Sequence, residues 1–570
     1  MEIRKLTGAE AIVQSLIAHQ VDTVFALPGA QIYGLIDALA KNATGGSIGR
    51  PGGPKGQPIR TIGARHEQAC AYMAFGYSRA SGQPGVFAVV PGPGILNASA
   101  ALLTANSSNQ RVLALTGDIP STMKGHERNA LHELRDQLAI LRSITKWADH
   151  IEHPAQAGFL IARAFQEMSS GRRGATALQA PWDYFTTTAG VGPPVTLPPF
   201  PVPEIDLDAI DEAAKIIASA RAPMLAVGSG ALDAASEVTA LAEMIGAPAV
   251  SFRGGRGVVS NDHPLGLTIS SAQRLWPQTD VAIVIGSRFE LLDMRWRYRP
   301  PGLKIIRIDI DPAEQRRLPA TVGIVADAAT GALSLMAALK KYGAPKHRRA
   351  EAIVAAREWA ATAHKSVQPQ LDYLNVIRSV LPRNGFFVDE ISQMGFAAMF
   401  AFPVYEPRTF VTSGHQGTLG FGFPTALGVK VAFPHRPVVS VTGDGGFMFA
   451  VQELATAVQY GINLVTLVFN NGSYGNVFRD QQQQFNGRLL GSELTNPDFV
   501  KLAESFGVTA CAVDSPASLR PALEKALGAD RPMLIEVKVP RGVDSDPWRI
   551  IQPDFDRAGS EAIPGGDQSG

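Results

Sequence analysis

Cysteine, long apolar runs and net charge are all scarce in this sequence of 570 residues. The two cysteines, Cys70 and Cys511, make neither a disulfide framework nor a metal site and are typical of a reducing compartment. Lys and Arg number 52 against 51 Asp and Glu, which argues against nucleic acid or an anionic membrane as partner. No apolar run approaches a membrane span, and the N-terminus lacks a signal-peptide pattern. We therefore expect a soluble cytoplasmic protein.

Short apolar runs, by contrast, alternate with amphipathic segments along most of the chain. Runs such as 23–27, 224–227 and 464–469 predict buried strands, and their alternation with helices is typical of α/β domains with parallel sheets. A proline-rich spacer near 193–203 and a charged, alanine-rich stretch at 346–365 interrupt this pattern. We predict three doubly wound parallel-sheet domains, at residues 1–188, 204–345 and 366–548, and a flexible tail at 549–570.

The most informative motif is Gly443-Asp444-Gly445, which follows a predicted buried strand at 438–441. The next predicted strand ends just before Asn471, so both polar clusters lie past the carboxyl ends of strands, where open α/β sheets bind ligands. Asp444, Asn471 and the carbonyl of Ser473 could together hold a hard cation that also contacts phosphates. Alone, the first motif fits an ordinary strand–turn–helix equally well; the asparagine makes the cation site the better interpretation.

These motifs resemble the signature of thiamine-diphosphate (ThDP) enzymes, in which Mg²⁺ joins the cofactor's diphosphate to the protein. The resemblance implies that Asp444, Asn471 and Ser473 are the metal ligands. It also implies that backbone N–H groups near Gly443, Gly445 and Gly446 approach the diphosphate oxygens.

A second motif, Arg65-His66-Glu67-Gln68-Ala69, opens a predicted helix that runs to about residue 79. Glu67 would lie in the first turn, where the helix dipole favours a carboxylate, and such a residue is often only a good helix start. The segment is similar, however, to the cofactor-activating segment of ThDP enzymes. The resemblance implies that Glu67 hydrogen-bonds the aminopyrimidine ring and so promotes loss of the thiazolium C2 proton.

A third segment, the glycine-rich run 412–422, resembles the loop that holds both ends of ThDP. The resemblance implies that the carbonyl of Gly417 binds the exocyclic amine and that Leu419 is a branched steric wedge. It assigns the diphosphate end of the cofactor to Gln393, Gly414, His415 and Gln416. Synthases of the family commonly have glycine and leucine at positions 415 and 416.

Over residues 5–548 the chain most resembles the acetolactate (acetohydroxyacid) synthase and benzaldehyde lyase branch of the superfamily. The segments that carry this resemblance include 27–30, 91–94, 144–147, 261–265 and 307–312. In that branch the first domain binds the pyrimidine and the third binds the diphosphate. The resemblance therefore implies a homodimer, or a dimer of dimers, in which Glu67 and Asp444 of different subunits act on one cofactor.

Three positions bear on the substrate. Gln31 lies where the lyase resemblance places a polar residue over the cofactor, and we expect it to donate a hydrogen bond to substrate. His132 could relay a proton, with a structural histidine as the equal alternative. Asp480 stands where synthases carry the tryptophan of the acceptor pocket. We expect a carboligase that decarboxylates a 2-keto acid, with pyruvate as donor and a carbonyl compound as acceptor. The alternatives are a 2-keto acid decarboxylase or lyase and, less favoured, a non-catalytic relative.

FAD is a further possible cofactor, because Gly254-Gly255 and Arg288-Phe289 resemble flavin-contacting parts of the synthases. The methionine- and glycine-rich segment expected after Pro264-Leu265 is replaced by the shorter run 266–271. The sequence therefore favours the absence of FAD and leaves its binding open.

Overall fold

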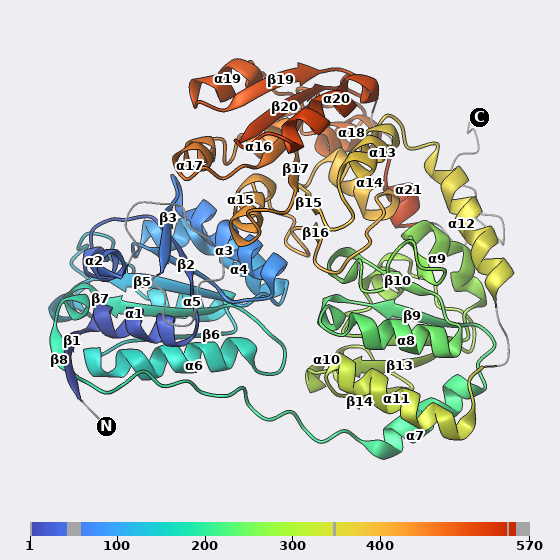
Figure 1. Cartoon of the computed structure of the whole chain (residues 1–570), viewed down its shortest axis with the longest axis horizontal. Helices are drawn as coiled ribbons and strands as arrows, with labels where there is room; N and C mark the ends of the chain where they lie inside the picture. The colour runs from blue at the N-terminus through green and yellow to red at the C-terminus, as the bar shows by residue number, and fades with distance from the viewer. Residues whose placement is uncertain (1–2, 43–58, 346–348, 544–545, 554–570) are drawn as a thin grey trace.

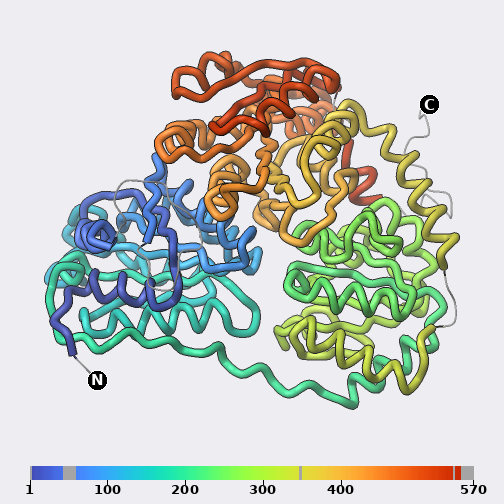
Figure 2. Tube along the Cα trace, in the orientation of Figure 1, coloured from blue at the N-terminus to red at the C-terminus, as the bar shows by residue number. Residues whose placement is uncertain are grey.

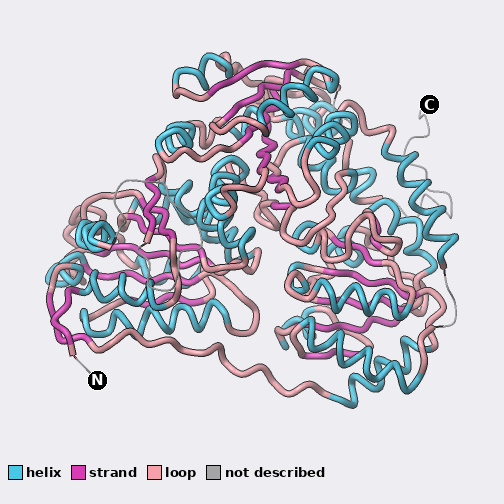
Figure 3. Tube along the Cα trace, in the orientation of Figure 1, coloured by secondary structure: helices cyan, strands magenta, loops and turns pink. Residues whose placement is uncertain are grey.

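Three six-stranded parallel sheets, each covered by helices, form the framework of the chain (Figures 1 and 3). The computed structural model describes residues 3–42, 59–345, 349–543 and 546–553. The predicted fold class, three α/β domains with parallel sheets, is confirmed. Among the helices of these described ranges, none is both long and apolar enough to cross a membrane.

The first domain, on the left of Figure 1, has the strand order β3-β2-β4-β5-β7-β6. A two-stranded antiparallel ribbon of β1 and β8 joins its beginning to its end. Its strands are β1 (Arg4–Thr7), β2 (Thr23–Ala26), β3 (Arg60–Gly63), β4 (Gly85–Val89), β5 (Val112–Asp118), β6 (Trp147–His150), β7 (Thr176–Pro181) and β8 (Thr188–Val191). Its helices are α1 (Gly8–Ala18), α2 (Tyr33–Lys41), α3 (Glu67–Ser81), α4 (Pro93–Ser107), α5 (Gln137–Ile144) and α6 (Ala157–Ser169).

The second domain has the order β11-β10-β9-β12-β13-β14 and follows an extended linker, which Figure 2 shows running along one edge of the molecule. Its strands are β9 (Pro223–Val227), β10 (Ala249–Ser251), β11 (Gly266–Leu267), β12 (Val281–Ile285), β13 (Lys304–Asp309) and β14 (Val322–Val325). Its helices are α7 (Leu207–Ala218), α8 (Ala235–Ile245), α9 (Ile269–Leu275), α10 (Pro312–Arg317) and α11 (Ala328–Tyr342); α12 (Ala350–His364) leads to the third domain.

The third domain has the order β16-β15-β17-β18-β20-β19. Its strands are β15 (Phe386–Val388), β16 (Phe410–Val411), β17 (Val438–Gly443), β18 (Val465–Asn470), β19 (Thr509–Val513) and β20 (Met533–Lys538). Its helices are α13 (Gln370–Val380), α14 (Gln393–Ala401), α15 (Gly422–Ala432), α16 (Asp444–Phe447), α17 (Glu453–Gln459), α18 (Gly475–Gln484), α19 (Phe499–Ser505), α20 (Pro516–Leu527) and α21 (Trp548–Ile551).

In each sheet the chain first adds one or two strands on one side of its first strand and then continues on the other side. The strand order therefore reverses between β2 and β4, between β9 and β12, and between β15 and β17. Ligands of open α/β sheets bind outside the carboxyl ends of strands at such switch points. The topology consequently offers three candidate sites, one in each domain.

Helices α3 and α15 join the first domain to the third. Every residue of α3 from Ala69 to Ala80 is buried. A Cβ added to Gly76 would lie 2.1 Å from the carbonyl oxygen of Thr425, and one added to Gly428 would lie 2.0 Å from that of Met73. The two helices can approach this closely only because both crossing positions are glycine. The start of α3, with Glu67, is thereby fixed relative to the third domain.

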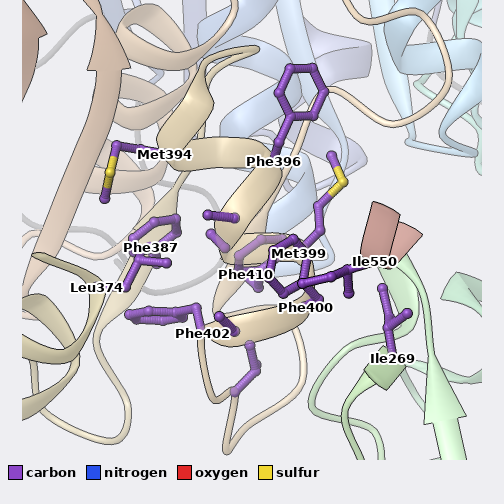
Figure 4. Packing of buried hydrophobic residues seen from close by; sticks show 14 of the residues in the cluster. Ile269, Leu374, Phe387, Met394, Phe396, Met399, Phe400, Phe402, Phe410 and Ile550 are labelled. Atoms are coloured by element: carbon purple, nitrogen blue, oxygen red, sulfur yellow. The ribbon is translucent and has the colours of Figure 1, made fainter. Parts of the chain in front are cut away.

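An apolar cluster joins the third domain to the second. Phe400 of α14 lies beside Ile269 of α9 and Ile550 of α21 (Figure 4). Ile550 and Ile551 of α21, just past the predicted boundary at residue 548, are buried in this cluster. Residues 554–570 of the predicted tail lie outside the described residues, and the domain boundaries remain predictions.

Candidate active site

The buried carboxylate of Asp444 is the centre of a polar cluster at the switch point of the third domain. Asp444 follows β17 and is the first residue of α16. Its Oδ1 accepts a hydrogen bond from the backbone N–H of Gly445 (2.9 Å), and its Oδ2 accepts from that of Gly472 (2.8 Å). Burial raises the pKa of Asp444 above its ordinary value, and hydrogen bonds, first that from Asn496, partly offset the rise.

Asn471 and Ser473 lie beside this carboxylate, after β18. Oδ1 of Asn471 accepts hydrogen bonds from the backbone N–H (3.1 Å) and the hydroxyl (2.9 Å) of Ser473. The described part of the chain has no group of three or more His, Cys, Asp or Glu side chains that could hold a metal. A cation here would therefore combine one carboxylate with amide and carbonyl oxygens, which are ligands that suit Mg²⁺ bound to a phosphate.

A cavity of about 310 Å³ opens beside the cluster. A Cβ on Gly445 would lie 2.4 Å from Cε1 of Tyr474, and one on Gly446 would lie 2.9 Å from Cγ of Glu390, so side chains at these positions would overlap their neighbours. The predicted residues that border the cavity are Gln393, Leu419, Gly443, Asp444, Gly445, Gly446, Asn471 and Ser473. The oxygen atoms of Asp444, Asn471 and Ser473 that could bind a cation, together with the glycine-lined wall, fit a diphosphate with its cation.

Glu390 is a buried acid of this site that the sequence analysis missed. Its Oε2 accepts a hydrogen bond from Gly422 N–H (2.8 Å), at the start of α15, and its Oε1 accepts from Ile391 N–H (3.0 Å). Burial raises its pKa to about 7, although these backbone hydrogen bonds oppose the rise. Glu390 thus connects two helices: it hydrogen-bonds the start of α15 and packs against Gly446 of α16.

Glu67 starts α3, as predicted, and is partly exposed. Its Oε2 accepts a hydrogen bond from Nδ2 of Asn97 in α4 (3.0 Å). A third-domain residue, Glu453, fixes the segment just before Glu67. Both of its carboxylate oxygens accept hydrogen bonds from the backbone N–H of Arg65 (3.1 and 3.2 Å). Glu453 is fully buried, and its role could not be read from the sequence.

Gln31 and His132, 101 residues apart, form a side-chain pair at the switch point of the first domain. Nδ1 of His132 lies 2.7 Å from Oε1 of Gln31, and Nε2 of Gln31 donates to the carbonyl of Leu131 (2.5 Å). Gln31 is buried, and one N–H of its side-chain amide donates to this backbone carbonyl; the expected bond from Gln31 to substrate remains a prediction. The pair adjoins Glu67 through the turn at 92–94: Gly92 packs against the backbone of His132, and Gly94 against Oε1 of Glu67.

The structure divides the predicted glycine-rich loop between two places. Leu419 borders the cavity of Asp444, whereas Gly414 and His415 border a crevice of the second domain. Nδ1 of His415 lies 3.1 Å from a carboxylate oxygen of Glu290, and the expected place of His415 at the diphosphate end remains a prediction. Burial alone would raise the pKa of Glu290, but His415 and Arg253 lower it to about 2. Gln416 and Gly417 are exposed and border neither cavity.

The crevice of the second domain, about 260 Å³, lies at the switch point between β9 and β12. Its walls include the backbone of Gly228 and Gly286, seven arginines and five acidic side chains. Four of these arginines are within ion-pair distance of Asp233, Glu290 or Glu314. Residues 266–271, on which the expected absence of FAD depended, do not border the crevice, and the absence of FAD remains a prediction. The arginines are Arg79, Arg111, Arg172, Arg173, Arg253, Arg288 and Arg408.

The cavity beside Asp444 is bordered by third-domain residues in the described part of the chain. The lining of the Asp444 cavity, taken over the described ranges, includes none of Glu67, Gln31 and His132. One chain thus presents two separate sets of candidate residues, each at the carboxyl edge of its own sheet.

Family comparisons agree with the three-domain architecture. Residues 6–140 match the N-terminal TPP binding domain of thiamine pyrophosphate enzymes, residues 210–337 match the central domain, and residues 390–537 match the C-terminal TPP binding domain. Thiamine pyrophosphate and ThDP are the same compound. The fold and these matches define a ThDP-binding enzyme, and the chain belongs to the thiamine pyrophosphate enzyme family.

Within the family the chain is acetolactate-synthase-like. It is 33% identical to the probable acetolactate synthase large subunit of Methanocaldococcus jannaschii, over 94% of this chain and 92% of that protein. It is 30% identical to the acetolactate synthase large subunit of Haemophilus influenzae, over 96% and 97%. A probable 2-ketoarginine decarboxylase of Pseudomonas aeruginosa is 31% identical, over 90% of each chain.

Proposed function

We propose that the protein is a Mg²⁺- and ThDP-dependent carboligase that decarboxylates a 2-keto acid, pyruvate in the first instance, and transfers the acyl-anion equivalent to a carbonyl acceptor. One observation carries the proposal. The buried cluster of Asp444 and Asn471 at one switch point is complemented by a helix-starting acid, Glu67, at another. The relatives named acetolactate synthase add support, since they match the chain over nearly its whole length.

Each set of residues has its own task in this proposal. When bound, ThDP supplies the nucleophilic carbon and the electron sink of the reaction. Glu67, held by Asn97, would hydrogen-bond the aminopyrimidine ring, and Leu419 would press on the cofactor beside the metal cluster. Asp444, Asn471 and Ser473 would hold the metal ion, and Gln393, Gly443, Gly445 and Gly446 would contact the diphosphate.

Two copies of the chain would complete each site in this proposal, as a homodimer or a dimer of dimers. Support comes from large apolar side chains that one chain leaves exposed beside both sets of residues, since such surfaces mark protein interfaces. Tyr33 and Leu131 lie next to the Gln31–His132 pair, and Phe449 follows α16; they are 59%, 62% and 49% exposed. The cytoplasmic location and the absence of nucleic-acid and membrane partners remain predictions from composition.

The deciding experiment is incubation of the purified protein with ThDP, Mg²⁺ and pyruvate, with and without FAD, while acetolactate, acetoin and acetaldehyde are resolved. We expect acetolactate, in equal amounts with and without flavin. Acetaldehyde alone would instead establish a simple decarboxylase. Absence of pyruvate turnover would direct the search to other 2-keto acids.

A decarboxylase or C–C lyase is the second candidate, favoured by a polar group where synthases have an aromatic pocket. Oδ2 of Asp480 accepts a hydrogen bond from Asn476 (3.2 Å), whose own Oδ1 accepts from Nε1 of Trp548 (3.2 Å). Asn476 borders the Asp444 cavity. Proton donors near the reacting carbon favour protonation, and hence aldehyde release, over ligation. The 2-ketoarginine decarboxylase relative is compatible with this alternative.

A further inference from the structure

Gln31 and His132 share an unusual backbone conformation. Their φ angles are +71° and +64°, in the left-handed region that residues other than glycine rarely adopt. Such a conformation is unfavourable and persists only where the surroundings enforce it. Two such residues that also hydrogen-bond each other are a candidate for a functional pair.

A buried glutamine, Gln137, helps to hold the backbone of both residues in this conformation. Its Oε1 accepts a hydrogen bond from Gly92 N–H (2.9 Å), and its Nε2 donates to the carbonyl of Gly117 (3.0 Å). These glycines follow β4 and end β5, and each makes room for one member of the pair. A Cβ on Gly92 would lie 2.5 Å from the carbonyl oxygen of His132, and one on Gly117 would lie 2.5 Å from that of Gln31. The side chain of Gln137 thus connects Gly92 and Gly117, and the strained backbones of His132 and Gln31 pack against these two glycines.

The hydrogen bonds of the pair determine which nitrogen of His132 carries the proton. The carbonyl of Leu131 can only accept, so the amide N–H of Gln31 must point to it. Oε1 of Gln31 then faces His132, and since this oxygen can only accept, Nδ1 must carry a hydrogen. In the neutral ring, Nε2 is left with a free lone pair.

We infer that Gln31 is a positioning residue that holds His132 in the Nδ1–H tautomer, so that Nε2 exchanges protons with substrate. As the new C–C bond forms, Nε2 would take the proton of the hydroxyl on the donor-derived carbon, which becomes a ketone again, and would give a proton to the oxygen of the acceptor carbonyl, which becomes the product hydroxyl. Nδ1–H would remain on Gln31 throughout, which leaves the ring unchanged. This inference depends on the proposed function, because it places the Gln31–His132 pair beside the reacting carbon. It changes the role of Gln31 from a donor to substrate to an acceptor from His132.

Two variants of Gln31 separate these roles. Gln31→Met removes both donor and acceptor, and we expect kcat with pyruvate to fall about 10–100-fold, as when the partner that orients a reactive imidazole is lost. Gln31→Glu keeps an acceptor for Nδ1–H but has no amide donor, and we expect a smaller fall in kcat than in Gln31→Met. Equal losses in both variants would overturn the inference, because they would show that the amide donor is what matters.

A double-variant cycle tests whether Gln31 acts through His132. We expect Gln31→Met/His132→Gln to be no slower than His132→Gln alone, because a positioning residue has nothing left to position. Multiplied losses would overturn the inference by giving Gln31 a separate role. If His132→Gln changes neither kcat nor the product ratio, the assignment of His132 itself is wrong. Unchanged ThDP affinity and thermal unfolding of the variants would show that they remain folded.

The tautomer can also be observed without turnover. In the ¹⁵N spectrum of histidine-labelled protein, the signals of His132 are those missing from His132→Gln. We expect a protonated Nδ1 and an unprotonated Nε2 in the wild type, and loss of this preference in Gln31→Met. A protonated Nε2 in the wild type would overturn the inference. Because this readout needs no substrate, it remains decisive even if pyruvate turnover fails and the proposed function falls.

Discussion

Nδ2 of Asn496 lies 2.6 Å from Oδ2 of Asp444 and 2.9 Å from Oδ1 of Asn470. A single amide therefore joins the carboxyl ends of β17 and β18. Because each of its two hydrogens has an acceptor, the amide fixes the plane of the Asp444 carboxylate and determines which lone pairs remain for a cation. The metal site that we propose thus depends on a residue that would not itself bind the metal.

Replacing Asn496 with alanine should weaken this site without removing a ligand. Loss of a partner that orients a metal ligand typically lowers metal affinity 10–100-fold, and we expect a fall of about that size in the Mg²⁺ dependence of ThDP binding. Titration of ThDP by calorimetry at several Mg²⁺ concentrations measures it. Asn463→Ala is the matched control, because Asn463 hydrogen-bonds the exposed Asp530 far from the cavity. Unchanged affinity in Asn496→Ala would contradict the assignment of Asp444 to the metal.

Glu67→Gln should separate cofactor activation from cofactor binding. An amide does not supply the proton relay of a carboxylate, and acid–base steps of this kind contribute about 10²–10⁴-fold. We expect exchange of the C2 proton of bound ThDP with D₂O, followed by ¹H NMR, to slow by that factor while the ThDP dissociation constant changes little. Glu152→Gln, at an exposed position of the same domain, provides the control. A normal exchange rate in Glu67→Gln would remove Glu67 from activation.

The residues that the sequence identified and the residues that it missed differ in a physical way. Asp444, Asn471 and Glu67 stand in contiguous runs at the ends of predicted strands or at a helix start, so local pattern alone places them at a carboxyl edge. Asn496 and Gln137 act through hydrogen bonds to residues that are distant in sequence, and neither stands in a distinctive run. Their roles depend on which strands become neighbours, and that is a property of the folded topology.

His415 shows which contacts the sequence could not predict. Its place in a glycine-rich loop predicts a position near the diphosphate, and the contact of its imidazole with Glu290 of the second domain could not be read from that pattern. The interaction joins two domains whose relative placement follows from the apolar packing of α14 against α9 and α21. The fold class of each domain was predictable from the alternation of strands and helices, whereas contacts between domains were not.

Asp389, fully buried beside Glu390, should make stability depend on pH. Burial, reinforced by the charge of Glu390, raises its pKa well above the ordinary value. Between the two values the folded state keeps the proton that the unfolded state has lost, so stability falls as pH rises, by up to about 1.4 kcal/mol per pH unit. Asp389→Asn has no such proton, and we expect urea unfolding to show a gain over wild type that grows from pH 5 to pH 8.

The control for this experiment has the opposite sign. Asp498 caps α19, and its hydrogen bond from Lys501 N–H lowers its pKa. Its stabilising effect is present above the ordinary pKa of an aspartate and is lost as pH falls. Asp498→Asn should therefore destabilise the protein near neutrality, and the difference should shrink towards low pH. A pH-independent difference in Asp389→Asn would mean that Asp389 is ionised in the folded protein.

Asp480→Trp tests the choice between ligation and aldehyde release. Asp480 lies in α18 and binds Asn476, which borders the cavity, so the substitution removes a polar group and adds the aromatic residue of the synthase resemblance. We expect the ratio of acetolactate to acetaldehyde to rise several-fold, as determined by chromatography of the products from pyruvate. Gln484→Trp, at the exposed end of the same helix, is the control. An unchanged ratio would mean that the side chain of Asp480 does not affect which product forms.

Complementation between two inactive variants tests whether each site draws on two subunits. If Glu67 and Asp444 of different chains act on one cofactor, Glu67→Gln and Asp444→Ala fail for different reasons. A mixed dimer then has one site that carries both changes and one site that carries neither. With random pairing half of the dimers are mixed, so about a quarter of the wild-type activity should return in the unfractionated mixture, and about half in the isolated mixed dimer.

The mixing experiment is carried out by co-expressing the two variants with different affinity tags and isolating the doubly tagged species. Sites contained within a single chain would stay inactive in every combination, because each chain would carry one of the two defects. Recovered activity in the doubly tagged fraction, absent from either variant alone, would therefore require Glu67 of one copy to face Asp444 of the other. That outcome would also explain why the cavity beside Asp444 lacks Glu67 among the described residues that border it within one chain.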